Sequence, residues 1–434
     1  MLTFAGYMRT LLLNTKDGAG GAGIAARRLL GALRHIGVEA DLLVRDRETS
    51  LPHIHTTGHR LAARAAFLME RCDVVRAQGG SRSNLFAIDP ATRGLRLDQS
   101  DLLRRADVVH LHWVNQGFLS LGGLRRLLAC GKGVVWTMHD MWPVTGICHH
   151  SEACRHWMQE CHDCRLLRRP AAQDLSWRTF LEKRSTYARG RISFVAPSDW
   201  LADIARRSPL TEGCPVHSIP NPIDTAFYAP GREAEVRERL GIPADHRVLL
   251  FAAYKATDEK KGTSYVKAAV QALAENSPEL RGRLHVIIVG REAETLREAF
   301  PCPAHCFEYV SEETVMRDLY RAADVLLMPT LMDNLPNTVV EAMACGTPCV
   351  AFSVGGLPQM IDHGRDGYLA RYRDEADFLH GIRSLLLADD YAAIARAARE
   401  SALRNYAAET VARRYQAVYE EALSHAACTK NPNS

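Results

Sequence analysis

Asp333 and Glu341 stand on either side of a predicted helix start. An apolar strand (323–328) leads into a loop, and a short helix is expected to begin near Asn337, whose side chain suits an N-cap. Unpaired N–H groups and a partial positive charge at a helix N-terminus favour a phosphate. Glu341 shares a helix face with Asn337 and would bind hydroxyl groups rather than the phosphate. An ordinary amphipathic helix of an α/β domain would show the same spacing.

Lys255 and Lys261 belong to a charged loop, KATDEKKGTS, which follows a predicted strand over Arg247–Tyr254. Two ammonium groups at the end of a parallel strand could neutralise a phosphate. A solvated loop is the more common interpretation of such a charge run.

A glycine-rich turn lies between a predicted strand over Arg9–Asn14 and a helix with apolar residues at helical spacing. Gly20 and Gly21 are central in it, with Gly18 and Gly23 beside them. Glycines allow the backbone to approach a ligand closely, and the following helix start favours an anion. Tight turns are rich in glycine for steric reasons as well, so the turn alone is weak evidence.

His139 and Asp140 follow a buried strand predicted over Gly133–Met138. Ligands of open α/β sheets bind at the carboxyl ends of the strands. We therefore expect His139 to donate or accept a hydrogen bond at a ligand rather than to act as a nucleophile, although a single histidine after a strand is often structural. His110 and His112 are weaker candidates.

Four cysteines have the spacing C-x5-C-x6-C-x2-C, namely Cys148, Cys154, Cys161 and Cys164. Four thiolates are a sufficient tetrahedral set for zinc, and they would close its coordination shell. The sequence therefore predicts a structural rather than a catalytic zinc. Free thiols, or disulfides formed on isolation, are the alternatives.

The overall composition is that of a globular protein with more than one core. The chain has 434 residues, 47% hydrophobic and 24% charged, with a net charge of +4. This charge does not indicate a nucleic-acid partner, although peripheral contact with a membrane stays open. Met1–Leu13 lacks the order of a signal peptide, and no apolar run reaches the ~18 residues that span a bilayer. Twelve cysteines without a signal peptide indicate the cytoplasm.

Strands and helices alternate along the whole chain, which predicts an α/β protein with parallel sheets. We expect an N-terminal domain over 1–222 with the Cys-rich insert 148–164, and a C-terminal domain over 223–405. The stretch 49–102 reads as an irregular insert. A last helix within 406–434 is expected to return to the first domain.

Asp333-x7-Glu341 within DNLPNTVVEAMACGTPCVAF resembles the E-x7-E signature of retaining glycosyltransferases with the GT-B fold. The branch that builds bacterial exopolysaccharides, including colanic-acid-type enzymes, is the most similar, and it carries a comparable Cys-rich stretch. The resemblance implies two Rossmann-like domains that face each other across a cleft, with the C-terminal helix crossing back. Asp333 replaces the first Glu of the signature, and Lys255 stands where the family usually has Arg.

The resemblance also implies site roles. His139, Asp333 and Lys261 would form the catalytic set. The donor would contact a group of residues in three loops, one strand end and one helix, namely Gly20, Gly21, Lys255, Lys261, Val310, Asn334, Leu335, Pro336, Asn337, Thr338 and Glu341. Glu341 would hold the donor ribose, and Lys261 the diphosphate.

The implied function is transfer of a hexosyl unit, with retention, from a UDP- or GDP-sugar to a glycan, lipid-linked or small-molecule acceptor. No cofactor is expected for catalysis. A nucleotide-sugar epimerase of GT-B type and a non-catalytic nucleotide-sugar-binding partner of an assembly complex are the alternatives. A dehydrogenase is disfavoured because GAGGAG lacks the G-x-G-x-x-G register.

Overall fold

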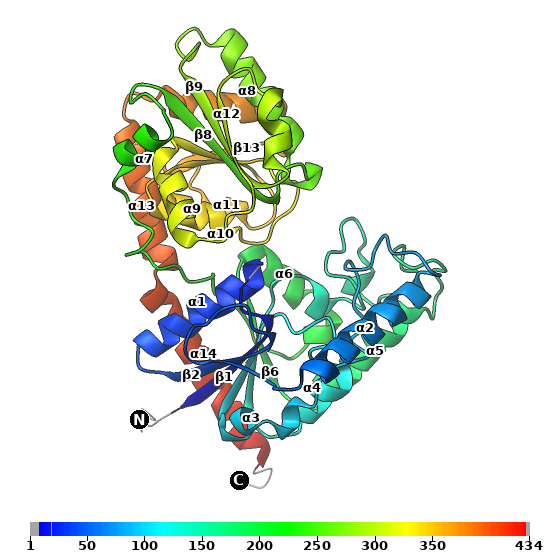
Figure 1. Cartoon of the computed structure of the whole chain (residues 1–434). Coiled ribbons are helices and arrows are strands. Elements are labelled where there is room, and N and C mark those ends of the chain that lie inside the picture. Colours follow the sequence, from blue (N-terminus) through cyan, green and yellow to red (C-terminus); the bar gives the residue numbers. More distant parts are fainter. Residues whose placement is uncertain (1–7, 19, 431–434) are drawn as a thin grey trace. The chain divides into compact units, whose positions relative to one another are not determined.

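The computed structural model describes residues 8–18 and 20–430. The first seven residues of Met1–Leu13, which the signal-peptide prediction concerns, lie outside the described residues. The chain divides into two compact units, Met1–Pro222 with Val411–Ser434, and Ile223–Thr410. Each unit contains one parallel sheet with helices on both faces (Figure 1). The predicted α/β class with two Rossmann-like domains is confirmed.

The sheet of unit 1 has the order β3-β2-β1-β4-β5-β6-β7. Its strands are β1 (Arg9–Lys16), β2 (Glu39–Asp46), β3 (Ile54–Thr56), β4 (Val108–Leu111), β5 (Gly133–Thr137), β6 (Ile192–Ala196) and β7 (Val216–Ser218). The α-helices are α1 (Gly21–His35), α2 (Arg60–Ala77), α3 (Asp101–Arg105), α4 (Leu121–Leu128), α5 (Leu175–Tyr187) and α6 (Asp199–Arg206). Ser198 caps α6, because its side chain accepts from the N–H of Leu201 at 3.1 Å.

The sheet of unit 2 has the order β10-β9-β8-β11-β12-β13. Its strands are β8 (Arg247–Lys255), β9 (Leu284–Arg291), β10 (Ala304–Phe307), β11 (Val325–Met328), β12 (Cys349–Phe352) and β13 (Gly367–Ala370). The α-helices are α7 (Glu233–Arg239), α8 (Thr263–Asn276), α9 (Glu313–Ala322), α10 (Asn337–Ala344), α11 (Leu357–Met360), α12 (Glu375–Leu386) and α13 (Tyr391–Tyr406).

Alternation along β8 explains why helices cover both faces of the second sheet. Val248, Leu250 and Ala252 pack into one core cluster, whereas Leu249 and Phe251 pack into another. Successive side chains of a strand point to opposite faces, so a continuous apolar run needs a helical layer on each side.

The last helix, α14 (Ala408–Lys430), packs on unit 1 as predicted. The hydroxyl of Tyr419 lies 2.8 Å from Nδ1 of His110, and the hydroxyl of Tyr415 lies 2.9 Å from Oγ1 of Thr137. Both tyrosines are buried, so this helix contributes directly to the core beneath β4 and β5.

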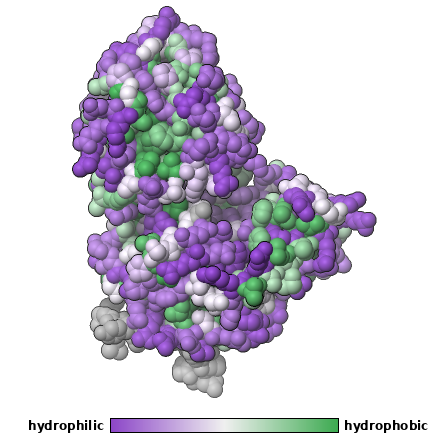
Figure 2. Space-filling view, in the orientation of Figure 1, coloured by the Kyte–Doolittle hydropathy of each residue, from purple (hydrophilic) through white to green (hydrophobic). Residues whose placement is uncertain are grey.

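The prediction that 49–102 is irregular is wrong, because the 18-residue helix α2 lies within it. Several apolar residues of α2 are exposed, among them Leu61, Leu68 and Met69, and this obscures the amphipathic pattern in the sequence. Figure 2 shows hydrophobic residues gathered over this part of unit 1. No helix in the described part of the chain is both long and apolar enough to cross a bilayer.

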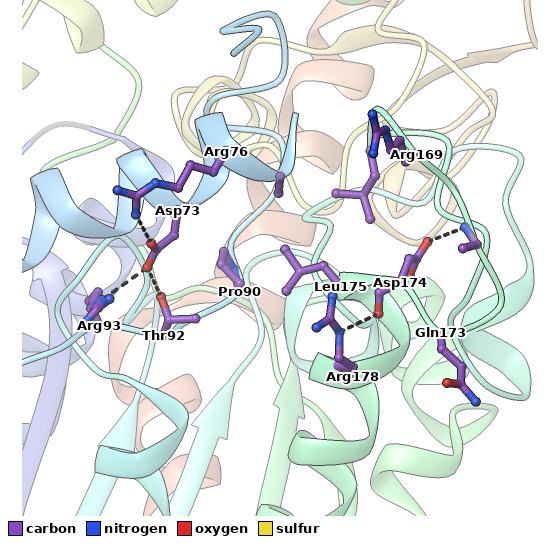
Figure 3. Close-up of a pocket in the computed structure, with 13 residues that line it drawn as sticks. Asp73, Arg76, Pro90, Thr92, Arg93, Arg169, Gln173, Asp174, Leu175 and Arg178 are labelled. Atoms are coloured by element: carbon purple, nitrogen blue, oxygen red, sulfur yellow. Dashed lines mark hydrogen bonds and ion pairs between the residues drawn. The ribbon is translucent and has the colours of Figure 1, made fainter. Parts of the chain in front are cut away.

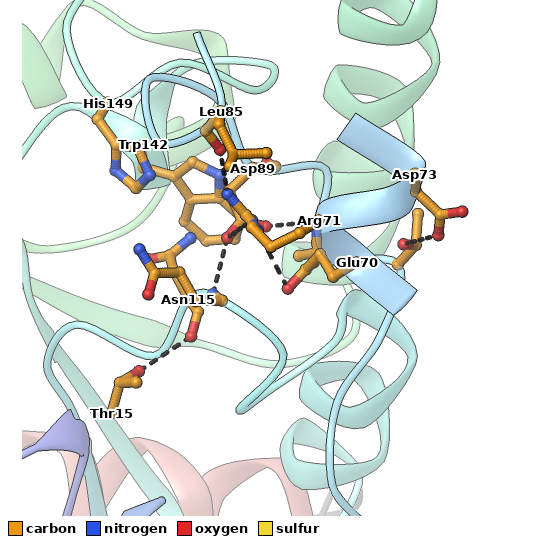
Figure 4. A network of polar contacts seen from close by, with 12 residues as sticks. Thr15, Glu70, Arg71, Asp73, Leu85, Asp89, Asn115, Trp142 and His149 are labelled. Carbon is orange, nitrogen blue, oxygen red and sulfur yellow. Dashed lines mark hydrogen bonds and ion pairs between the residues drawn. The ribbon is translucent and has the colours of Figure 1, made fainter. Parts of the chain in front are cut away.

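A buried polar network ties α2 to the sheet of unit 1 (Figure 4). The Arg71 guanidinium lies 3.1 Å from Oδ2 of Asp89, which also accepts the N–H of Gln116 at 2.7 Å. The indole N–H of Trp142 donates to the carbonyl of Asp89 at 2.7 Å. Burial, followed by the nearby Asp89, raises the pKa of Glu70 to about 10, so Glu70 is protonated and neutral at pH 7. The stretch 49–102 is therefore an integral, packed part of unit 1.

Candidate functional site

In unit 2 the strand order reverses between β8 and β11. Ligands of open α/β sheets bind beside the carboxyl ends of the strands at this switch point. The loop after β8 ends at Lys261 and Gly262, and the loop after β11 carries Asp333. Two of the three predicted catalytic residues therefore come from the two loops that flank the switch point.

Lys261 and Asp333 form an ion pair, with Nζ 2.7 Å from Oδ2. Their side chains are 35% and 20% exposed, so both remain open to a ligand. The other carboxylate oxygen of Asp333 accepts the N–H of Asn334 at 2.9 Å, which fixes the carboxylate at the loop. An ammonium group in this position can neutralise a phosphate and also limit its repulsion from Asp333.

Two glycines allow the loops around this ion pair to approach closely. Gly262 has φ +86°, and a Cβ there would lie 2.1 Å from the carbonyl oxygen of Pro329. Gly355 has φ +59°, and a Cβ there would lie 1.9 Å from the carbonyl oxygen of Asp333. A side chain at either position would push the backbone of the Asp333 loop away. The glycines thus help to set the position of the ion pair.

Helix α10 begins at Asn337, and its N-cap is Pro336, with no side-chain capping bond. The prediction that Asn337 is the N-cap is therefore wrong, because Pro336 already has the extended cap conformation and Asn337 is the first helical residue. No acidic residue lies in the first turn. No side chain caps this end of the helix, so the positive end of the helix dipole faces the loop that carries Asp333 and favours an anion there.

Glu341 lies one turn inside α10 and is 7% exposed. The hydroxyl of Tyr320, on α9, donates to its Oε2 at 2.7 Å. Thr347 in turn donates to the carbonyl of Tyr320 at 2.7 Å. Sequence reasoning missed Tyr320, because a tyrosine in an amphipathic helix gives no local sign of a polar partner. The contact holds the Glu341 carboxylate in one position.

Two further predicted donor residues of unit 2, Lys255 and Val310, contact partners other than this ion pair. Nζ of Lys255 lies 2.9 Å from Oε1 of Glu292, a partner that sequence reasoning also missed. Val310 packs against the core near the end of β10. Strand β10 (Ala304–Phe307) ends just before Glu308, whose carboxylate accepts the N–H groups of Glu292 and Glu294 in the loop after β9.

In unit 1 the switch point lies between β1 and β4. Gly20 is the N-cap of α1, with φ +91°, and Gly21 begins the helix. No side chain caps this helix, and its first turn contains no acid. Both glycines are exposed. Contact of Gly20 and Gly21 with an anion stays a prediction.

Three histidines form a chain beneath this edge of the sheet. His139 Nε2 lies 3.0 Å from Nδ1 of His112, and the centroids of the His110 and His112 rings lie 4.2 Å apart with their planes tilted by 38°. Burial lowers the pKa of His139 to about 4 and that of His110 to about 3, and it lowers the pKa of His112 well below its usual value. All three are neutral at pH 7, so His139 can serve as a hydrogen-bonding group without charge.

We expect unfolding to become easier as the pH falls from about 6.5 to 4. The pKa values of these histidines are lower in the folded chain than the usual 6.5, so the unfolded chain takes up protons first and acid favours it. The shift of His139 alone corresponds to roughly 3 kcal/mol in the free energy of unfolding. Urea titrations at pH 7 and pH 4.5 measure the loss. His110→Gln should reduce the loss of unfolding free energy between pH 7 and pH 4.5, whereas His35→Gln, at an exposed position, should not. An equal loss in the parent protein and both variants would contradict this account.

Asp140 holds the loop that carries His139. Its Oδ2 accepts from Trp113 Nε1 at 2.9 Å and lies 2.7 Å from Nδ1 of His149, and its Oδ1 accepts the N–H of Trp142 at 2.8 Å. The His149 imidazole is the main favourable neighbour that lowers the pKa of Asp140 to about 2 against the opposing effect of burial. Asp140 is therefore an anion that positions the loop.

The four cysteines lie near one another, since Cys154, Cys161 and Cys164 each help to raise the pKa of Cys148, after burial as the main cause, to about 12. All cysteines in the described part of the chain are free thiols. Within residues 8–18 and 20–430, no group of three or more His, Cys, Asp or Glu side chains is arranged to hold a metal ion. The present geometry thus does not supply a zinc site, and zinc remains a prediction from the spacing.

Elemental analysis of freshly purified protein tests this prediction. A structural zinc would give about one ion per chain, and replacing Cys161 with serine would remove it. Exposed Cys130→Ser is the matched control and should retain the metal. A zinc content near zero in the parent protein would contradict the prediction.

A pocket of about 620 Å³ lies between α2 and the segment that precedes α5 (Figure 3). Asp73 lies 3.3 Å from the Arg76 guanidinium and 3.2 Å from that of Arg93. Asp174 accepts the N–H groups of Ser176 and Trp177 and so caps α5. No predicted site residue lines this pocket.

Two family profiles match the chain in consecutive parts. Glycosyltransferase Family 4 matches residues 19–227, and Glycosyl transferases group 1 matches residues 246–388. A D-inositol 3-phosphate glycosyltransferase of Geodermatophilus obscurus is 34% identical over 186 residues, 39% of each chain. Its counterpart in Thermobispora bispora is 32% identical over 218 residues, 48% of this chain and 50% of the relative. The chain thus spans half or less of the length of these curated relatives.

Solved structures with the same fold cover nearly the whole chain. Sucrose-phosphate synthase of Thermosynechococcus elongatus has a TM-score of 0.64 at 17% identity and covers 96% of this chain and 99% of its own. HepE of Anabaena, solved with UDP and glucose, has a TM-score of 0.61 at 15% identity and covers 96% and 100%. At such identities the likeness shows the fold.

Proposed function

We propose that this chain is a group 1 glycosyltransferase of the GT-B fold, which transfers a sugar from a nucleoside-diphosphate sugar to an acceptor hydroxyl. The observation that carries the proposal is the Lys261–Asp333 ion pair at the switch point of unit 2. It combines a cation for a diphosphate with a carboxylate for sugar hydroxyls.

Departure of the diphosphate is the difficult step, because negative charge develops on the leaving group. Lys261 and the uncapped start of α10 would stabilise that charge in the transition state. Lys255 would add a second cation if it exchanged Glu292 for the diphosphate. These groups provide the positive charge from the chain itself, so we propose a reaction that needs no catalytic divalent cation.

We propose the remaining roles from the resemblance to the GT-B family. Glu341 would hold the ribose, and Asp333 with His139 would hold the transferred sugar. The backbone of 334–338 and the glycines Gly20 and Gly21 would contact the diphosphate or sugar, and Val310 would flank the base. We propose transfer with retention, in which the leaving phosphate helps to deprotonate the acceptor on the same face of the sugar.

A thermal-shift screen with UDP-, GDP- and dTDP-sugars tests the proposal. Binding to the folded state alone raises the midpoint of unfolding. HepE of Anabaena was solved with UDP, which makes the UDP-sugars the first to try. Acceptor trials with the best donor, followed by product analysis, should then show transfer. The absence of stabilisation by any donor would contradict the proposal.

Two alternatives predict different behaviour in the same assays. An epimerase would convert the donor sugar without an added acceptor. A non-catalytic binding partner would be stabilised by a donor but show no turnover, and Lys261→Ala would then change only the affinity. Transfer that depends on an acceptor excludes both.

We also propose that the chain makes peripheral contact with an anionic membrane and that it is located in the cytoplasm. The exposed side chains of Leu61, Leu68 and Met69 lie on α2 among arginines, a combination that favours an anionic lipid surface. Free thiols throughout the described part of the chain agree with a reducing compartment. Sedimentation with phosphatidylglycerol vesicles, compared with phosphatidylcholine vesicles, tests the contact.

A further inference from the structure

A pocket of about 670 Å³ in unit 1 contains far more positive than negative charge. It lies where β1, β2 and β3 end, beside the first turns of α2. Five cationic side chains line it, and Asp46 is its only carboxylate among the described residues; the cations are Lys16, Arg45, Arg47, Arg60 and Arg64. Such a concentration of one sign in a pocket favours a ligand of the opposite sign.

The contacts of these five cations show which of them already pair with a carboxylate. Lys16 lies 3.0 Å from a Glu48 carboxylate oxygen, and Arg45 pairs with Asp46. Among the residues that the structure describes, Arg47 donates only to backbone carbonyls, those of Thr49 and Leu51. Arg60 and Arg64 have no carboxylate partner in the part of the chain that the structure describes, and both are exposed. Three guanidinium groups are therefore left without a counter-ion.

We infer that this pocket binds a phosphate or diphosphate group carried by the sugar acceptor. The inference rests on the proposed transferase function, because it assigns the acceptor a chemical class. Arginine forks match phosphate oxygens in pairs, and a phosphate carries up to about two negative charges where a carboxylate carries one. The excess of three guanidinium groups fits the larger charge.

The pocket is also better suited to this role than the arginine-lined pocket between α2 and α5 (Figure 3), where Asp73 already neutralises Arg76 and Arg93. It opens at the carboxyl ends of the parallel strands, the edge at which β5 delivers His139. Phe67 and Phe86 also line the pocket, so a short apolar tail next to the phosphate would find contacts.

The phosphate could belong to a soluble sugar phosphate or to a lipid-linked sugar. Calorimetric titration with inorganic pyrophosphate and with farnesyl diphosphate distinguishes these sources. Equal affinities indicate a soluble phosphate, and tighter binding of farnesyl diphosphate indicates a lipid-linked one. Either result supports the pocket. The titrations use the Lys261→Ala background, so that the proposed donor site contributes little.

In that background, Arg60→Gln with Arg64→Gln should weaken binding of the tighter probe by about tenfold or more. Arg184→Gln with Arg189→Gln removes two exposed charges elsewhere in unit 1 and should leave the affinity unchanged. Raising the salt should weaken binding to the parent pocket. Equal affinity in the Arg60/Arg64 variant and its control, or no binding of either probe, would overturn the inference.

Donor binding separates this inference from the proposed function. With Lys261 intact, the Arg60/Arg64 variant should keep the thermal shift produced by the best nucleotide sugar. If that shift is present and the probes fail to bind, only the acceptor assignment is wrong. If no nucleotide sugar binds the parent protein while the probes still do, the transferase proposal is wrong and the anion pocket stands.

Discussion

Replacing Glu341 with alanine is expected to lower kcat/KM for sugar transfer by about two to three orders of magnitude. The carboxylate is buried and fixed by Tyr320, so it is placed to accept hydrogen bonds from a ribose without reorganisation. Loss of charge-assisted hydrogen bonds of this kind costs about 2–4 kcal/mol in the transition state. Steady-state kinetics with the donor found in the thermal-shift screen measures the effect.

Two controls separate this loss from damage to the fold. The alanine variant leaves the buried Tyr320 hydroxyl without its acceptor, which should cost about 1–3 kcal/mol of stability. Tyr320→Phe removes the hydroxyl that fixes the carboxylate but keeps the carboxylate itself, so it should lower kcat/KM by less than Glu341→Ala does. Normal turnover of the folded Glu341→Ala protein would contradict the assignment of Glu341 to the donor.

Lys261→Ala is expected to lower kcat by about a hundredfold or more. Its ammonium group would interact most strongly with the diphosphate as negative charge develops there, so the loss should appear in kcat more than in KM. The variant also leaves Asp333 without its counter-ion, next to the expected position of the diphosphate. This repulsion adds to the effect. Single-turnover measurements under saturating donor isolate the chemical step.

Lys260→Ala is the matched control, because Lys260 is the exposed neighbour and its backbone carbonyl, which accepts from Leu331, is retained. It should change kcat by less than about threefold. Lys255→Ala should have an intermediate effect, because Lys255 must first leave Glu292. A Lys261 variant with weaker donor binding but an unchanged kcat would show that the lysine acts in binding alone.

The alternation of apolar strands with helices was sufficient to predict the fold. The long apolar runs of β8 and β9 require cover on both faces, and such runs are local in the sequence. Helix α2 was not predictable in the same way, because it exposes Leu61, Leu68 and Met69 and buries Glu70 and Arg71. Its polar interior is stabilised by Asp89, a contact across 18 residues that no periodic pattern reveals.

The candidate site was predictable where its residues lie in the loops of a switch point. Lys261 and Asp333 are 72 residues apart, yet the order of parallel strands brings their loops together. Side-chain partners from other elements were not predictable. Glu341 is bonded by Tyr320, and Lys255 pairs with Glu292. Both contacts depend on how the elements pack and on how far the side chains reach, which the spacing of residues does not encode.

A structure of the protein with its nucleoside diphosphate bound tests the central claim most directly. We predict that Nζ of Lys261 exchanges Asp333 for a diphosphate oxygen, at the start of α10, with the Glu341 carboxylate within hydrogen-bonding distance of the ribose. A diphosphate bound elsewhere, with the 2.7 Å contact between Lys261 and Asp333 unchanged, would contradict the account.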